Sequence, residues 1–148
     1  GGNRSVLYRN TGNWKFEEIP NAAGMNTEKT YQGAWGDFNG DGYLDLVTGG
    51  KLFRNPGGDG SWIKVQLVGK RKVNRSAIGS QVRIRLGDKI LVRQVDGATG
   101  QGNQNDSVLH FGLGKTKGAV LIEVRWSNGH VQKAKGDINK TVKIICSK

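Results

Sequence analysis

Hydrophobic and polar residues alternate along most of the second half of the chain. Ile63, Val65 and Leu67 share one face of an extended segment, and Lys64 and Gln66 lie on the other. The same alternation recurs in two further segments, at residues 82–86 and 120–126. A period of two residues predicts antiparallel strands that are buried on one side only.

Turn residues separate these segments and complete an all-β pattern. Gly, Asn and Asp mark the turns, and further strands are predicted at residues 89–95, 108–112, 131–134 and 141–145. No segment shows the period of an amphipathic helix. Short strands at this spacing predict an antiparallel β-sandwich or small barrel over residues 62–148.

The first part of the chain contains an internal repeat. Leu7-Tyr8-Arg9-Asn10-Thr11-Gly12 returns forty-five residues later as Leu52-Phe53-Arg54-Asn55-Pro56-Gly57. A repeat of this length is typical of propeller blades, whose strands pack against neighbouring blades. Residues 1–61 are therefore predicted to be partial propeller-type blades from a longer array. A strand is expected at residues 14–19, with Trp14 and Phe16 packed inward.

An acidic loop lies between two predicted strands of this region. Its oxygen-bearing side chains recur with a spacing of two or four residues, at Asp37, Asn39, Asp41 and Asp45. Gly42 lies where the backbone must turn. Three carboxylates so close together repel one another unless a cation lies between them, and Ca²⁺ prefers oxygen ligands. The loop lacks the glutamate that an EF-hand places at its twelfth position, which is Thr48 here.

The segment 34–47 resembles the calcium loops of FG-GAP/VCBS repeats, which form integrin-α-like propellers. This resemblance implies that Ca²⁺ is the cofactor. It also implies the ligands, namely the side chains of Asp37, Asn39, Asp41 and Asp45 and the backbone carbonyl of Tyr43.

Charge is distributed unevenly between the two parts. Residues 1–61 carry six Lys and Arg against seven Asp and Glu, whereas residues 62–148 carry seventeen against five. The excess suggests an anionic partner for the second part, an acidic polysaccharide or a protein, unless it is only a solvated basic surface. The candidate polyanion-binding residues are Lys70, Arg71, Lys72, Arg75, Arg83 and Arg85. Without interleaved exposed aromatic residues, sequence-specific nucleic-acid binding is not expected.

A polar, glycine-rich loop spans residues 97–106. Its side chains suit a sugar or a second cation, with Asp96, Gln104, Asn105 and Asp106 as candidate ligands. The alternative is a connection held by its own hydrogen bonds. His110 lies in a predicted strand, where a packed residue is expected rather than a catalytic base.

Several segments after residue 61 resemble the ASPIC/UnbV domain, notably 62–69, 74–79, 104–114 and 124–129. The resemblance implies a β-rich extracellular, secreted or cell-surface module and supplies no enzymatic activity. The single cysteine excludes an internal disulfide, and no apolar run is long enough to span a membrane.

These features together predict a non-catalytic, calcium-binding extracellular module for adhesion or binding. The chain begins within a repeat, so it is expected to belong to a longer protein. The alternative is a structural subunit of a larger secreted or envelope assembly. A third hypothesis is a hydrolase that uses Asp96, Asp106 or His110.

Overall fold

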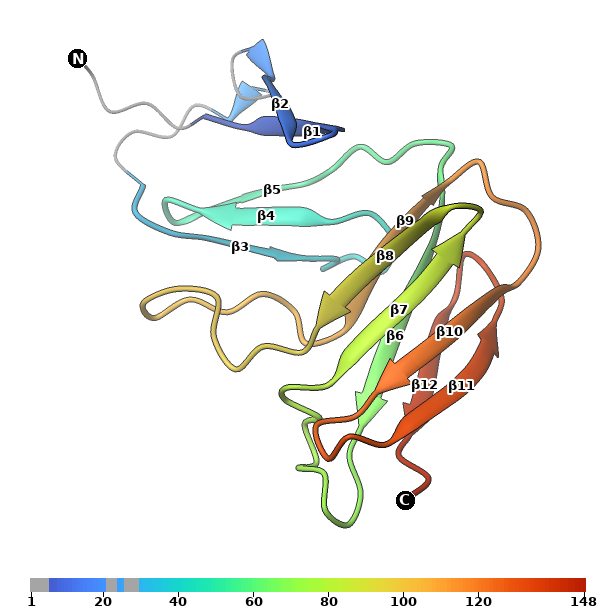
Figure 1. Ribbon diagram of the computed structural model, residues 1–148. Helices are drawn as coiled ribbons and strands as arrows, with labels where there is room; N and C mark the ends of the chain where they lie inside the picture. The colour runs from blue at the N-terminus through green and yellow to red at the C-terminus, as the bar shows by residue number, and fades with distance from the viewer. Residues whose placement is uncertain (1–5, 21–23, 26–29) are drawn as a thin grey trace.

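The computed structural model describes residues 6–20, 24–25 and 30–148. Within these residues the protein has twelve strands in four sheets and no α-helix. The predicted all-β class is therefore confirmed. Figure 1 shows the strands of the first part of the chain beside a larger, two-sheet body that contains the C-terminus.

The first part, here called the repeat unit, contains a hairpin and a three-stranded antiparallel sheet. The hairpin joins β1 (Tyr8–Gly12) to β2 (Lys15–Glu18). The sheet is formed by β3 (Gly33–Gly36), β4 (Asp45–Thr48) and β5 (Lys51–Phe53), with β4 in the centre.

The hairpin of the repeat unit corrects one expectation. The strand β2 forms where predicted, but Trp14 is 94% exposed and Phe16 is 54% exposed. Within the described residues β1 and β2 pair only with each other, so no sheet covers these aromatic side chains. The prediction that they pack inward was therefore wrong.

The second part, here called the β-domain, is a sandwich of two sheets. One sheet has the order β11-β10-β7-β8 and the other the order β12-β6-β9. The strands are β6 (Ser61–Val68), β7 (Gln81–Leu86), β8 (Lys89–Gln94), β9 (Leu109–Gly114), β10 (Val120–Arg125), β11 (Val131–Gly136) and β12 (Thr141–Ile145). One pair departs from the predicted antiparallel pattern, because β12 runs parallel to β6.

The core of the β-domain lies between its two sheets and follows the alternation in the sequence. Ile63 and Val65 of β6 are completely buried, as are Ile84 of β7 and Val124 of β10. Phe111 of β9 is the largest of these fully buried side chains. Each core strand therefore directs its alternate residues inward, which leaves the other set free to form functional surfaces.

Candidate metal centre at the domain junction

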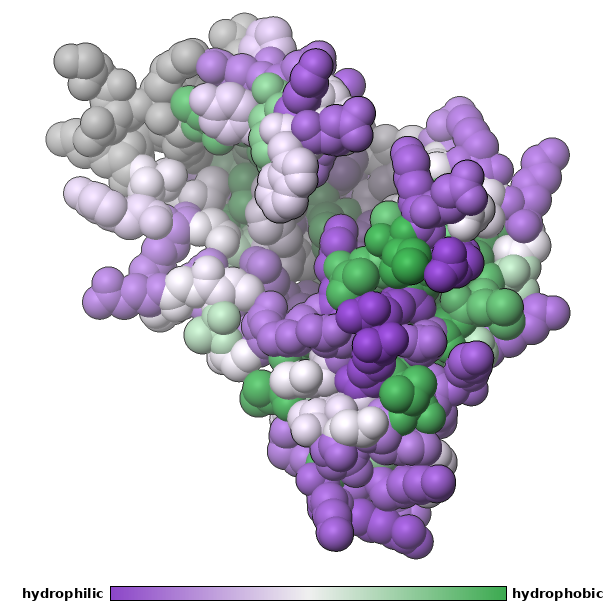
Figure 2. Space-filling model, viewed as in Figure 1, coloured by the Kyte–Doolittle hydropathy of each residue, from purple (hydrophilic) through white to green (hydrophobic). Residues whose placement is uncertain are grey.

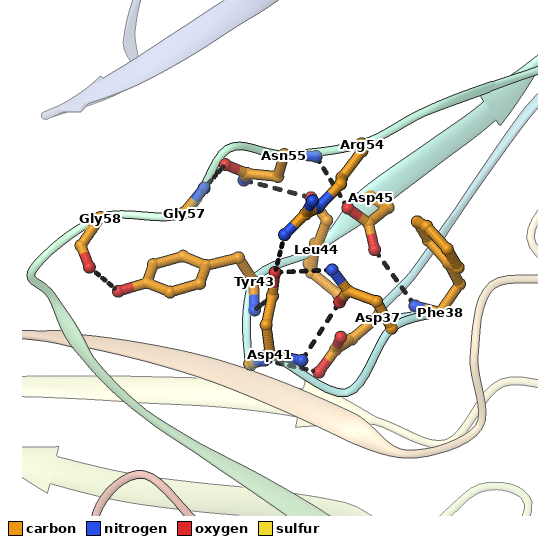
Figure 3. Close-up of polar contacts among 12 residues, drawn as sticks. Asp37, Phe38, Asp41, Tyr43, Leu44, Asp45, Arg54, Asn55, Gly57 and Gly58 are labelled. Atoms are coloured by element: carbon orange, nitrogen blue, oxygen red, sulfur yellow. Dashed lines mark hydrogen bonds and ion pairs between the residues drawn. The ribbon is translucent and has the colours of Figure 1, made fainter.

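The acidic loop joins β3 to β4, and its own side chains fix its backbone (Figure 3). The Asn39 Oδ1 atom accepts a hydrogen bond from the Asp41 N–H at 3.1 Å. The Asp41 Oδ1 atom in turn accepts one from the Tyr43 N–H at 3.0 Å. Gly40 and Gly42 both have positive φ angles, which glycine adopts at little cost. The spacing of the polar residues thus produces consecutive side-chain-capped turns.

Asp45 connects this loop to the repeated motif. Its side chain is buried and accepts hydrogen bonds from the Phe38 N–H at 3.1 Å and the Asn55 N–H at 2.7 Å. The Asn55 Oδ1 atom then accepts from the Gly57 N–H at 3.0 Å. In the other copy of the repeat, Asn10 and Gly12 make the same contact at 2.8 Å. The repeated Asn-x-Gly sequence therefore forms the same turn twice.

Asp37 links the acidic loop to the β-domain. Its Oδ2 atom lies 2.6 Å from the Nζ atom of Lys64 on β6 and also accepts the Gly42 N–H at 2.8 Å. Both charged side chains are buried, with 1% of Asp37 and 13% of Lys64 exposed. Burial raises the pKa of Asp37, but the hydrogen bonds from Lys64 and Gly42 and the lysine charge outweigh it and lower the pKa below its ordinary value.

Two more residues of the β-domain contact the loop at Gly42. A Cβ atom at this position would lie 1.8 Å from Cε2 of Trp62, so only glycine allows the indole ring to approach. The Nε2 atom of His110 lies 2.7 Å from the Gly42 carbonyl oxygen, which can only accept, so this nitrogen carries the proton. Burial lowers the pKa of His110 below its ordinary value, which favours the neutral imidazole. His110 therefore packs in the junction, as predicted.

The residues of the loop fit calcium in their chemistry. Carboxylate, amide and carbonyl oxygens are the ligands that Ca²⁺ prefers. The Oδ1 atom of Asp37 is buried and receives no hydrogen bond, which is costly for a carboxylate without a cation nearby. Among the described residues, however, no three His, Cys, Asp or Glu side chains gather closely enough to hold a metal ion as placed. Asp41 and Asp45 instead accept hydrogen bonds from N–H groups of the chain.

The polar loop 97–106 lies along the edge of β3 in the repeat unit (Figure 1). The Trp35 N–H donates to Asn105 Oδ1 at 2.9 Å, and the Asp106 N–H donates to the Trp35 carbonyl at 3.0 Å. The Asn103 side chain donates to the Gly33 carbonyl at 2.7 Å. The asparagine side chains and the backbone of this loop therefore form a contact between the two parts of the chain, which the sequence did not indicate.

The four candidate ligands in this region line one cleft of about 280 Å³, together with His110. Several of their polar atoms already have partners within the protein. Asp96 Oδ1 accepts from Gln94 at 3.0 Å, Asp106 Oδ1 accepts from the Val108 N–H at 3.0 Å, and Gln104 donates to the Asp96 carbonyl at 3.0 Å. The residues named in the hydrolase hypothesis thus share a cleft, but the protonated nitrogen of His110 is held by Gly42 rather than facing either carboxylate.

The predicted basic residues fall into two separate groups. The loop between β6 and β7 carries Lys70, Arg71, Lys72 and Arg75, all exposed. Arg83 and Arg85 lie on β7 and line a different cleft, which contains none of the four loop residues. Two cations that the sequence did not single out, Arg125 and Lys133, join them there.

Fold and junction together define the class of protein: a propeller-type repeat with an acidic loop, packed on a β-sandwich. The chain belongs to the ASPIC and UnbV family, whose sequence profile matches residues 69–147. The profile of the FG-GAP-like repeat matches residues 1–48. Both predicted resemblances are confirmed.

Among curated proteins, the chain is similar to cartilage acidic protein 1. The human protein is 29% identical over 95% of this chain and 23% of its own length. The protein of Xenopus tropicalis is 32% identical over 76% of this chain and 19% of its own length. The chain therefore spans about a fifth to a quarter of these relatives. No solved structure matches it significantly. No helix in the described part of the chain has the length and apolar character needed to cross a membrane.

Proposed function

We propose that this chain is a non-catalytic, extracellular binding module in which calcium fixes the repeat unit against the β-domain. The ion would be held by the side chains of Asp37, Asn39, Asp41 and Asp45 and by the Tyr43 carbonyl. The names of the relatives place them in cartilage, which supports an extracellular or secreted location. The β-domain would present the surface that binds an acidic partner.

The single observation that carries this proposal is the state of the Asp37 carboxylate. One oxygen is bound by Lys64 of the β-domain, and the other is buried without a partner. A cation at the second oxygen would satisfy it while the first oxygen keeps its bond to the β-domain. Calcium would also offset the repulsion among the carboxylates of the loop. The loop residues supply orientation and charge, and no chemical step is required of them.

Calcium binding is tested by thermal unfolding of the chain in 1 mM calcium and in EDTA. For a Kd on the order of 10⁻⁴ M, calcium stabilises the fold by about 1.4 kcal/mol. For a chain of this length the corresponding rise in Tm is roughly 3–6 °C. Asp41→Ala should abolish the rise. Asp88→Asn is the matched control, since this exposed aspartate lies in the turn between β7 and β8. Identical melting curves in calcium and in EDTA would refute the proposal.

A further inference from the structure

The solvent-facing side of the sheet β11-β10-β7-β8 carries an ordered array of charged residues. Strand register places Lys133 beside Glu123 and Glu123 beside Arg83, which makes one row across three strands. Neighbouring strands are about 4.8 Å apart, so side chains in such a row are within reach of one another. The alternate residues of the same strands form the core, and this face is turned away from it.

A cleft of about 270 Å³ runs across this array and is here called the cationic cleft. Its four cations are Arg83, Arg85, Arg125 and Lys133. Two exposed aliphatic side chains also line it, Leu121 of β10, which is 72% exposed, and Ile90 of the edge strand β8, which is 46% exposed. Figure 2 shows green apolar side chains directly among purple polar ones on this face. Exposed aliphatic groups ringed by charge are typical of a surface that meets a partner.

The charges of the cationic cleft are not balanced within the described residues. Glu123 is the one carboxylate that lines it, and Arg125 already holds it with an Nε–Oε1 distance of 2.8 Å. Arg83 has a buried Nε atom without a hydrogen-bond partner. No acidic side chain in the described part of the chain pairs with Arg85 or Lys133. Glu123 also interacts electrostatically with Arg83 and Lys133, but four cations against one carboxylate leave three net positive charges for an external anion.

We propose that the cationic cleft binds an acidic protein segment that also carries aliphatic side chains. Its carboxylates pair with Arg83, Arg85 and Lys133, and its aliphatic side chains cover Leu121 and Ile90. Arginine suits this role because its guanidinium group holds a carboxylate with two parallel hydrogen bonds. This inference rests on the proposed function of the chain as a binding module and specifies the chemistry of its partner.

Two observations favour a protein segment over an acidic polysaccharide. None of the described residues that line the cationic cleft has an aromatic ring on which a sugar could stack, and two of them, Ile90 and Leu121, are exposed aliphatic residues. A polysaccharide held by charge alone would leave Leu121 exposed, whereas aliphatic side chains would remove it from water.

Both β7 and β10 are inner strands whose backbone groups are paired on both sides. Recognition must therefore come from side chains and not from the addition of a strand at these positions.

The test uses fluorescence anisotropy with labelled synthetic peptides of equal length and charge, in which Glu alternates with Leu or with Ser. The Glu–Leu peptide should bind at least tenfold more tightly than the Glu–Ser peptide. The double variant Arg83→Gln/Arg85→Gln should weaken its binding at least tenfold. The matched control Lys70→Gln/Arg71→Gln removes the same charge from the β6–β7 loop and should change the affinity less than twofold.

A second variant separates apolar contact from charge and guards against a folding defect in the arginine variant. Leu121→Ser, at an exposed position, should weaken the Glu–Leu peptide severalfold and leave the Glu–Ser peptide unchanged. Equal affinity for the two peptides would overturn the proposal. So would a loss of affinity in the loop control Lys70→Gln/Arg71→Gln as large as that in Arg83→Gln/Arg85→Gln. A heparin-derived oligosaccharide that binds more tightly than the peptide, and does not respond to Leu121→Ser, would assign the cleft to a polysaccharide instead. The calcium-dependent rise in Tm does not depend on the cationic cleft. Peptide binding can therefore fail while calcium binding is confirmed, and the reverse.

Discussion

The contact between Gly42 and Trp62 gives the most direct test of how the acidic loop meets the β-domain. Gly42 has a φ of +91°, and its missing Cβ atom would lie 1.8 Å from Cε2 and 2.1 Å from Nε1 of the Trp62 ring. The substitution Gly42→Ala therefore introduces two separate penalties. One is the strained backbone of an L-residue at positive φ, and the other is a steric clash with the β-domain.

The two penalties have different expected sizes. The left-handed backbone conformation costs an L-residue about 1–2 kcal/mol. Overpacking a closely packed contact costs typically about 1–3 kcal/mol. Gly42→Ala should thus lower the free energy of unfolding by about 2–5 kcal/mol. Gly40→Ala is the matched control, because Gly40 lies in the same loop at φ +75° and nothing lies within 4 Å of its missing Cβ atom. It should cost only about 1–2 kcal/mol.

The losses in free energy of unfolding of Gly42→Ala and Gly40→Ala are compared by urea unfolding, which is followed by tryptophan fluorescence and circular dichroism. Both substitutions reduce the entropy of the unfolded chain equally, so the comparison isolates the contact with Trp62. In a Trp62→Ala background the clash disappears, and Gly42→Ala should then cost no more than Gly40→Ala. Equal losses for the two glycine variants in the natural background would show that the loop does not press on Trp62 and would refute the reasoning.

Three further substitutions probe the same junction by urea unfolding. Lys64→Met leaves the buried Asp37 carboxylate without its ion-pair partner and should cost about 3–5 kcal/mol in EDTA. In calcium, Lys64→Met should lower the free energy of unfolding by less than it does in EDTA, because the ion supplies the missing positive charge. An equal loss in calcium and in EDTA would argue against calcium at Asp37. Asn105→Ala removes the acceptor for the Trp35 N–H and should cost about 1–3 kcal/mol, against no loss for the exposed control Gln101→Ala. Asn139→Ala removes the acceptor for the Trp62 N–H and also places alanine at a φ of +57°, so it should destabilise more than Asn139→Asp, which keeps that oxygen and tolerates this backbone conformation.

The sequence predicted those features that depend on local spacing. Alternating residues identified the strands of the β-domain and the inward faces that form its core, for example Ile63 and Val65. The spacing of Asp37 and Asp45 identified a loop between two antiparallel strands, and β3 and β4 are such strands. Both patterns depend only on residues that are close together in the sequence, so they can be recognised without knowing which distant segments come into contact.

The features that sequence did not predict depend on which surfaces are covered. A period of two residues places Lys64 opposite Ile63, but it cannot say whether that second face meets water or another part of the chain. Lys64 was assigned to the polar face and is in fact buried against Asp37. The available signal was Trp62, since a large aromatic residue on the same face suggests that this face is covered. Arg125 and Lys133 were likewise missed, because only the pairing of strands that are distant in sequence brings them into the same cleft as Arg83.

The proposed calcium site and the domain junction share the same atoms, so the two should be energetically coupled. Asp37 would offer one oxygen to the ion and already gives the other to Lys64, and Gly42 contacts both Trp62 and His110. Any ordering of the loop by calcium then favours the docked arrangement of the β-domain. By thermodynamic reciprocity, docking must raise the affinity of the loop for calcium by the same factor. The charge of Lys64 repels the ion and so reduces this gain in affinity, and the unfolding of Lys64→Met in calcium and in EDTA measures by how much.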